Sequence, residues 1–287
     1  MTGQVSTIGV VGAGTMGSGI ALVAARSGFE VQLIDAEHQF VQRGLDRITA
    51  ELDKAVGRGN LDEADRDATL TRITGSTDYA QLAGCDIVIE AVPETLAIKE
   101  PVLTAISDAV DESCIVASNT SSLGIHDLST FVSHPARMVG MHFFNPVPRM
   151  ELVEVIAADG TSEETVEAVK DVARAMGKTP VRSADRPGFI VNRVLIPMIN
   201  EAILALQEGI ASAEDIDIAM ELGAAHPMGP LSLADLIGLD VVLDIMHVLE
   251  NAFGDKFAPA QLLVDMVEQG RLGRKSGNGF FSYEGGR

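Results

Sequence analysis

The chain has 287 residues, a length that suits one large or two ordinary domains. Its composition, with 46% hydrophobic and 22% charged residues, is typical of a globular protein. Its net charge of −20 argues against a nucleic-acid-binding surface. No apolar run reaches the roughly 18 residues of a membrane span, and the first six residues lead directly into a predicted core strand, so neither membrane insertion nor a signal peptide is expected.

The first predicted element is a buried strand, residues 8–11, which breaks at a glycine-rich turn and continues as a helix. The turn reads G-A-G-T-M-G and has the G-x-G-x-x-G spacing of the dinucleotide-binding fingerprint. In that fingerprint the first glycine permits a tight turn, the second lets the backbone approach a pyrophosphate, and the third lets the helix pack on the strand. The helix N-terminus offers free N–H groups to the phosphates. The predicted cofactor-binding residues are therefore Gly12, Ala13, Gly14, Thr15, Met16 and Gly17.

Asp35 follows the second predicted strand, residues 31–34, and lies 23 positions after Gly12. An acidic residue near this position binds the ribose hydroxyls of the adenosine. Its charge would repel a 2′-phosphate, by up to about 4 kcal/mol for unit charges 4 Å apart at an effective dielectric of 20. No arginine follows among residues 36–38, so the sequence predicts NAD rather than NADP.

Residues 37–73 form a predicted helical insertion that carries a basic stripe. The stripe consists of Arg43, Arg47, Lys54 and Arg58, whose spacing places them on one helix face. One interpretation is a solvated face whose charges pair with Asp46, Glu51 and Asp53. The other is a binding surface for a phosphorylated substrate.

Further strands are predicted at residues 87–92, 114–118, 138–141, 152–156 and 179–182, with helices at residues 99–110 and 166–176 between them. Ligands of an open α/β sheet bind beyond the carboxyl ends of the strands. The polar residues at such positions are Pro93-Glu94, Asn119 to Ser121 and His142. Cys85 and Cys114 lie beside or within these strands and are predicted to be buried free thiols, consistent with a reducing cytoplasm. The six histidines lack ligand spacing, so no metal is predicted.

The alternation of strands and helices stops near Arg186, and the apolar residues from Ile190 to Leu206 repeat with helical period. Pro197 is expected to kink this helix rather than end it. More helices are predicted near residues 214–222, 231–252 and 259–270. The predicted fold is α/β, with an NAD-binding Rossmann-type domain over residues 1–186 and an all-α domain over residues 187–287. The apolar faces of that second domain exceed what one small bundle can bury, which indicates a subunit interface.

Six stretches of this chain together resemble the 3-hydroxyacyl-CoA dehydrogenases, in particular the free-standing bacterial 3-hydroxybutyryl-CoA dehydrogenases. In chain order they are GAGTMG, SNTSSL, HFFNPVPRMELVEVI, RPGFIVNR, AHPMGPLSLADLIGLD and GRKSGNGFF. The resemblance implies a Rossmann domain, a helical domain that forms a homodimer, and reversible NAD-linked oxidation of an L-3-hydroxyacyl-CoA to the 3-ketoacyl-CoA.

The resemblance also implies roles for individual residues. His142 matches the family's catalytic histidine and Glu154 its acidic partner, while Ser121 and Asn192 match residues that position the substrate oxygen and the catalytic groups. Lys54 and Arg58 fall in the segment that meets the CoA phosphates. Glu51 stands where some relatives have a CoA-binding serine, which is a departure from the pattern. Cofactor contacts are implied at Gly12, Gly14, Gly17, Asp35, Glu94, Lys99, Ser121, Asn145 and Lys275.

The chemistry required of these residues is a proton transfer beside a hydride transfer. Histidine suits the proton transfer because its charge changes near neutral pH. A carboxylate that accepts its second N–H would fix the tautomer and the ring orientation, and Glu154 lies twelve residues later on a predicted neighbouring strand. Without such a partner, a single histidine followed by two phenylalanines would be interpreted as a residue of the hydrophobic core. Two alternatives are a sister dehydrogenase of small hydroxy acids, of the gulonate-oxidising kind, and a non-catalytic NAD-binding protein of the same fold.

Overall fold

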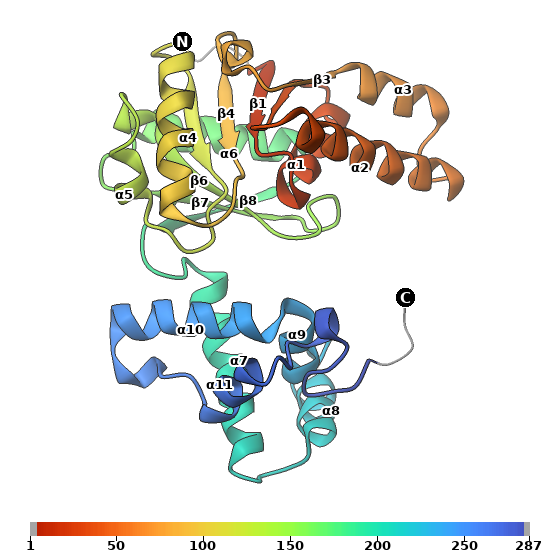
Figure 1. Ribbon diagram of the computed structural model, residues 1–287, viewed down its shortest axis with the longest axis vertical. Coiled ribbons are helices and arrows are strands. Elements are labelled where there is room, and N and C mark those ends of the chain that lie inside the picture. Colours follow the sequence, from red (N-terminus) through yellow and green to blue (C-terminus); the bar gives the residue numbers. More distant parts are fainter. Residues whose placement is uncertain (1–4, 284–287) are drawn as a thin grey trace. The chain divides into compact units, whose positions relative to one another are not determined.

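The computed structural model describes residues 5–283, and the chain divides into two compact units, residues 1–186 and 187–287. The first unit holds an eight-stranded sheet with the order β3-β2-β1-β4-β5-β6-β7-β8 (Figure 1). Pairing is parallel from β3 to β6, antiparallel between β6 and β7, and parallel again between β7 and β8. The strands are β1 (Thr7–Val11), β2 (Glu30–Ile34), β3 (Ile73–Ser76), β4 (Ile87–Glu90), β5 (Ile115–Ser118), β6 (Met138–Phe143), β7 (Leu152–Ala157) and β8 (Thr179–Ala184).

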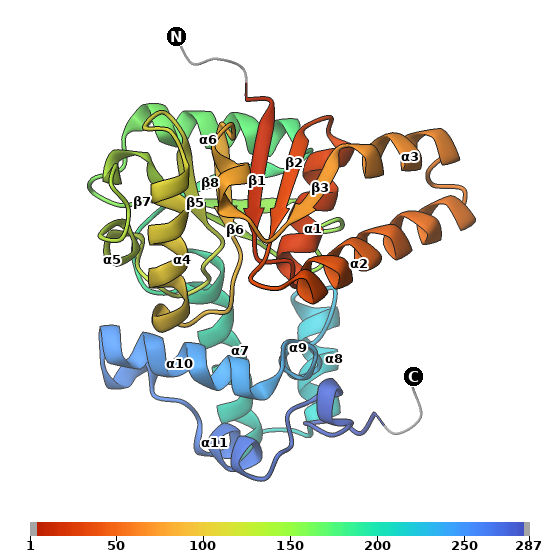
Figure 2. The ribbon, with the colours of Figure 1, turned by 45° about the horizontal axis from the view of Figure 1, so that its top comes forward.

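The helices of this unit are α1 (Thr15–Arg26), α2 (His38–Gly57), α3 (Glu63–Thr71), α4 (Leu96–Ala109), α5 (Ile125–Ser129) and α6 (Glu163–Ala175). The predicted insertion consists of α2 and α3, which project from the sheet beyond the edge strand β3 (Figures 1 and 2). The base of α2 lies against the glycine-rich turn. A Cβ atom added at Gly44 would lie 2.8 Å from the Cβ of Ala13, so glycine is required for this approach.

The two faces of the central strands differ in chemistry. Val139, Met141 and Phe143 belong to the main hydrophobic core, which also contains buried residues of α1 and α6. Because side chains alternate along a strand, His142 points to the opposite face. The register pairs Glu90 with Ser118, Ser118 with Gly140, and His142 with Glu154. Buried polar side chains from four strands therefore share one face of the sheet.

The second unit is helical, with α7 (Val191–Gln207), α8 (Ala213–Gly223), α9 (Pro230–Ile237), α10 (Leu239–Phe253) and α11 (Gln261–Glu268) around its own hydrophobic core. Helix α7 continues through Pro197, as predicted. The single helix predicted over residues 231–252 is wrong. The structure divides it into α9 and α10 at Gly238, which has a φ of 106° that continues no right-handed helix.

The structure confirms the predicted fold class, a Rossmann-type α/β domain followed by a helical domain. Both cysteines are buried free thiols. Burial raises the pKa of Cys85 to about 11 and that of Cys114 to about 12, so neither is a reactive thiolate at neutral pH. Within residues 5–283, no helix is long and apolar enough to cross a membrane, and no group of three or more His, Cys, Asp or Glu could hold a metal ion.

Candidate active site

The glycine-rich turn has the local geometry that its sequence requires. Gly12 has a φ of 103°, and a Cβ atom added at Gly17 would lie 1.7 Å from the Gly12 carbonyl oxygen. A Cβ atom added at Gly14 would instead meet no described atom within 4 Å. Gly14 therefore borders open space, and no described side chain caps the first turn of α1 beside it. This arrangement fits a pyrophosphate on the helix N-terminus.

Asp35 lies directly after β2, and its carboxylate is tied to the same turn. Its Oδ2 accepts a hydrogen bond of 2.6 Å from the Ala13 amide, and its Oδ1 accepts one of 2.7 Å from the Ala36 amide. Asp35, which is predicted to bind the ribose hydroxyls, therefore also stabilises the glycine-rich turn. A carboxylate has about four lone-pair positions, so these two bonds leave acceptor capacity for hydroxyl groups.

His142 and Glu154 form a buried hydrogen-bonded pair. Nδ1 of His142 lies 2.7 Å from Oε2 of Glu154, and the two residues are 7% and 0% exposed. The pair follows from the antiparallel register, which places the two residues directly opposite each other on β6 and β7. Because an ionised carboxylate only accepts, Nδ1 carries the hydrogen and Nε2 remains the basic atom of the imidazole. The ring also lies 4.4 Å from that of Phe144.

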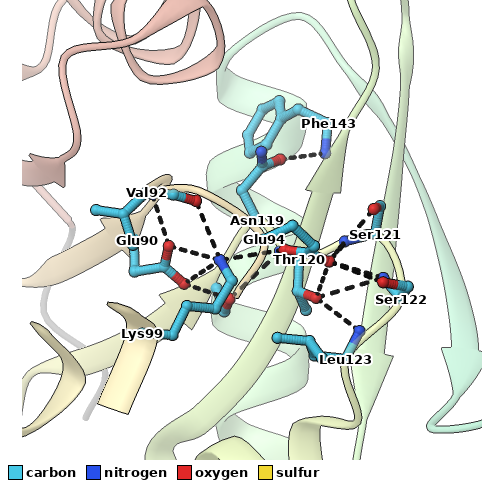
Figure 3. Close-up of polar contacts among 11 residues, drawn as sticks. Glu90, Val92, Glu94, Lys99, Asn119, Thr120, Ser121, Ser122, Leu123 and Phe143 are labelled. Carbon is cyan, nitrogen blue, oxygen red and sulfur yellow. Dashed lines mark hydrogen bonds and ion pairs between the residues drawn. The ribbon is translucent and has the colours of Figure 1, made fainter. Parts of the chain in front are cut away.

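Glu94 holds the loop that follows β5 (Figure 3). Its Oε1 accepts hydrogen bonds from the Thr120 hydroxyl at 2.5 Å and from the amides of Ser121 and Ser122 at 2.7 and 2.9 Å. Burial by itself would raise the pKa of Glu94, but the Lys99 ammonium and these donors lower it below its ordinary value. Glu94 is thus an anion at neutral pH, and it fixes the backbone at Ser121.

Beneath Glu94 lies a buried charge pair between the end of β4 and the first turns of α4. Lys99 is 1% exposed and Glu90 is 0% exposed, and Nζ of Lys99 donates to both carboxylate oxygens at 2.7 and 2.9 Å. The same Nζ lies 3.3 Å from Oε2 of Glu94 (Figure 3). Ser118 donates to Glu90 at 2.6 Å. Lys99, predicted as a cofactor contact, therefore lies under the Glu94 loop rather than at its surface.

Sequence reasoning did not single out Glu90, and it placed Asn119 at the carboxyl end of a strand without predicting its contact. Glu90 ends an otherwise apolar strand, I-V-I-E, and a charge in such a run is a signal that could have been used. Asn119 accepts a hydrogen bond of 2.8 Å from the Phe143 amide through its Oδ1, which links the end of β5 to the end of β6. Its partner is a backbone group 24 residues away, and a single sequence carries no signal for such a contact.

A pocket of about 360 Å³ lies on the first unit, between α1, α2 and the loop that follows β6. Its cationic lining residues are Arg47 and Lys54. Its remaining lining residues are Thr15, Ser18, Gly19, Leu22, Ile48, Ala50, Glu51, Asn145, Pro146, Val147 and Pro148. The pocket thus combines two cations and the Glu51 carboxylate with an apolar wall, and it includes Thr15 of the glycine-rich turn.

The basic stripe has mixed surroundings. Arg47 donates to the Ala13 carbonyl at 3.2 Å and to the Ser18 hydroxyl at 3.1 Å, and the guanidinium of Arg43 lies 4.7 Å from the centre of the Phe40 ring. Lys54 lies 3.7 Å from Glu51, a pairing that the solvated-face interpretation anticipates. Arg58 is the C-terminal cap of α2 and is not among the pocket-lining residues.

Two predicted site residues belong to the second unit. Asn192 is the second residue of α7. Lys275 lies in a short 3₁₀ turn, residues 274–276, and forms an ion pair with Asp240. The chain that follows this turn is held by Asp235, which is 1% exposed and accepts hydrogen bonds from the amides of Phe280 and Phe281.

A Rossmann-type sheet with a nucleotide-binding turn and a buried histidine–carboxylate pair defines an NAD-binding oxidoreductase, and comparison with known proteins agrees. Residues 7–186 match the family model of the 3-hydroxyacyl-CoA dehydrogenase NAD-binding domain, and residues 188–283 match that of the C-terminal domain. The chain belongs to the 3-hydroxyacyl-CoA dehydrogenase family, as the sequence motifs predicted.

Similar proteins span the whole chain. A probable 3-hydroxybutyryl-CoA dehydrogenase of Deinococcus radiodurans is 49% identical over 96% of this chain and 99% of its own length. The 3-hydroxybutyryl-CoA dehydrogenase of Bradyrhizobium diazoefficiens is 45% identical over 100% and 98%. The crystal structure of (S)-3-hydroxybutyryl-CoA dehydrogenase from Ralstonia eutropha has a TM-score of 0.96 at 48% identity, covering 98% of this chain and 99% of that one.

The Glu90–Lys99 pair yields a stability prediction. Lys99→Met should lower the free energy of unfolding by about 3–5 kcal/mol, because it leaves Glu90 buried without a compensating charge. Arg174→Met is the control, since its partner Asp171 and its own side chain are more than half exposed, and it should cost less than about 1 kcal/mol. Urea denaturation measures both. Equal effects of the two substitutions would contradict the compensating role of Lys99.

Proposed function

We propose that this protein catalyses the reversible, NAD-dependent oxidation of a short-chain L-3-hydroxyacyl-CoA, with 3-hydroxybutyryl-CoA and acetoacetyl-CoA as the substrate pair. The observation that carries the proposal is the His142–Glu154 hydrogen bond of 2.7 Å, on the same unit as the nucleotide-binding turn. The names of the relatives support the choice of substrate.

In this mechanism His142 is the acid–base residue. During oxidation its Nε2 accepts the proton of the 3-hydroxyl group, and during reduction it returns that proton. Glu154 holds Nδ1–H and stabilises the imidazolium that forms. NAD, when bound, supplies the hydride chemistry. Ser121, which Glu94 fixes, and Asn192 orient the substrate oxygen.

The pair is tested by acetoacetyl-CoA reduction with NADH. Glu154→Gln should lower kcat by roughly 10²–10⁴, the range for a general acid–base contribution, and His142→Gln should cost at least as much. The double variant should cost less than the product of the two, because the residues act as one unit. Glu164→Gln, an exposed change on α6, should leave kcat unaltered. Near-normal turnover by folded His142→Gln protein would rule out the mechanism.

We propose NAD rather than NADP as the cofactor, with Gly12 to Gly17, Asp35, Glu94, Lys99, Ser121, Asn145 and Lys275 at or beside its site. The Asp35 carboxylate beside the glycine-rich turn supports this choice, because it would repel a 2′-phosphate. The wild-type protein should therefore show a higher kcat/KM with NADH than with NADPH, and Asp35→Asn should narrow the ratio. Equal use of both cofactors by the wild type would refute the role of Asp35.

We also propose that the pocket between α1 and α2 receives the CoA moiety, with Lys54 and Arg58 near its phosphates. Replacing both residues by Ala should raise the KM for acetoacetyl-CoA by roughly fivefold, since exposed charge pairs contribute about 1 kcal/mol. The effect should shrink at high salt, where charges are screened, while NADH binding stays constant. Arg66→Ala on α3 is the control, because its partners are Asp53 and Asp67. An unaltered KM in the double variant would instead favour the interpretation that the basic stripe is a solvated helix face.

Finally, we propose that the protein forms a homodimer through its C-terminal helices. We also propose that it resides in the reducing cytoplasm. The second unit exposes large apolar side chains, including Leu222 at 82%, Ile210 at 71% and Val194 at 67%. Burying such a face against its own copy would give an isologous contact. Light scattering at micromolar concentration should report twice the chain mass. A monomer under these conditions would contradict the proposal.

A further inference from the structure

One loop serves both the histidine–glutamate pair and the pocket. It comprises residues 144–151 and joins β6, which ends at Phe143, to β7, which begins at Leu152. His142 and Glu154 therefore lie on the two strands that this loop connects. The same loop supplies Asn145, Val147 and Pro148 to the pocket wall. A displacement of this loop would alter the shape of the pocket.

Lys178 holds this loop from beneath. It lies between α6 and β8 and is 8% exposed. Its Nζ donates hydrogen bonds to the carbonyl oxygens of Val147 at 2.6 Å and Met150 at 2.8 Å. Burial lowers the pKa of Lys178, and the nearby Glu151 carboxylate opposes that shift. A buried ammonium needs such acceptors, because charge removed from water without partners is costly.

Two further contacts restrain the loop. The amides of Arg149 and Met150 both donate to the Pro146 carbonyl, at 2.9 and 3.0 Å. On the other side, Val147 is 2% exposed and packs on α1 at Gly19. A Cβ atom added at Gly19 would lie 2.9 Å from the Cβ of Val147. Val147 is thus enclosed between helix α1 and the Lys178 ammonium.

We propose that Lys178 is a positioning residue for the acyl-CoA pocket. Its ammonium bridges two carbonyl groups of the loop and so keeps Asn145, Val147 and Pro148 in the pocket wall. The inference rests on the proposed assignment of the pocket to acyl-CoA. The His142–Glu154 pair lies inside the β6–β7 ladder, which Lys178 does not join. Loss of the ammonium should therefore weaken substrate binding more than it slows turnover of bound substrate.

The test compares Lys178→Met with Thr161→Val. Thr161 is the matched control because its hydroxyl donates to the Met138 carbonyl at 2.7 Å, at the opposite end of β6. Both changes remove hydrogen bonds to backbone carbonyl groups, which belong to the loop after β6 for Lys178 and to the first residue of β6 for Thr161. Lys178→Met should raise the KM for acetoacetyl-CoA by roughly tenfold with a smaller change in kcat, because a displaced pocket wall binds the substrate less well and a misplacement of about 1 Å can cost up to about 10²-fold. Thr161→Val should leave the KM within about twofold of wild type.

Amide hydrogen exchange reports on the loop without activity. In the wild type the amides of Arg149 and Met150 should be protected, and Lys178→Met should accelerate their exchange while Thr161→Val does not. Lys178→Gln receives the same measurements if Lys178→Met does not fold. A folded Lys178 variant with a wild-type KM, or unprotected loop amides in the wild type, would overturn the inference. If the wild type does not reduce acetoacetyl-CoA, the proposed function fails, and exchange still decides whether Lys178 holds the loop.

Discussion

The antiparallel register of β6 and β7 is the constraint on which the candidate site depends. It places His142 opposite Glu154, and it places Met141 opposite Val155 on the core face. A slip of one residue would turn every side chain to the other face. The imidazole and carboxylate would then enter the hydrophobic core, while apolar side chains replaced them at the site. Core packing on one face of the sheet thus specifies the polar geometry on the other.

Burying charge on that face requires local compensation. Glu90 and Glu154 are both inaccessible to solvent, and each has a hydrogen-bond donor within 2.7 Å. The donors to Glu90 include the ammonium of Lys99, which is also buried and lies near Glu94, and the hydroxyl of Ser118. Such arrangements cost stability when a partner is lost. The same buried contacts hold the loops at the carboxyl ends of the strands, where ligands of this fold class bind.

The glycine-rich turn and most of the strands and helices were predictable from the sequence, because each depends on residues that are close together in the chain. The glycines of the nucleotide-binding turn are required by one φ angle and one close contact, and both operate within six residues. Hydrophobic periodicity similarly located the helical insertion, the helical second half and every strand of the sheet except β3, the short edge strand after the insertion, whose residues are only partly buried or exposed. The division of residues 231–252 at Gly238 was missed, because a single glycine within an apolar run does not by itself end a helix.

The sequence by itself therefore determined the family, the fold class, the nucleotide-binding turn and the identity of the histidine and its acidic partner. Only the tertiary structure decided that Lys99 is buried against Glu90, that Glu94 fixes the Ser121 loop, and that Lys178 bridges the Val147 and Met150 carbonyls. These contacts join residues 9 to 31 positions apart, and all but the Lys99–Glu90 pair attach a side chain to a backbone atom. Backbone carbonyls and amides are the same at every position, so a sequence cannot mark which of them a distant side chain will bind.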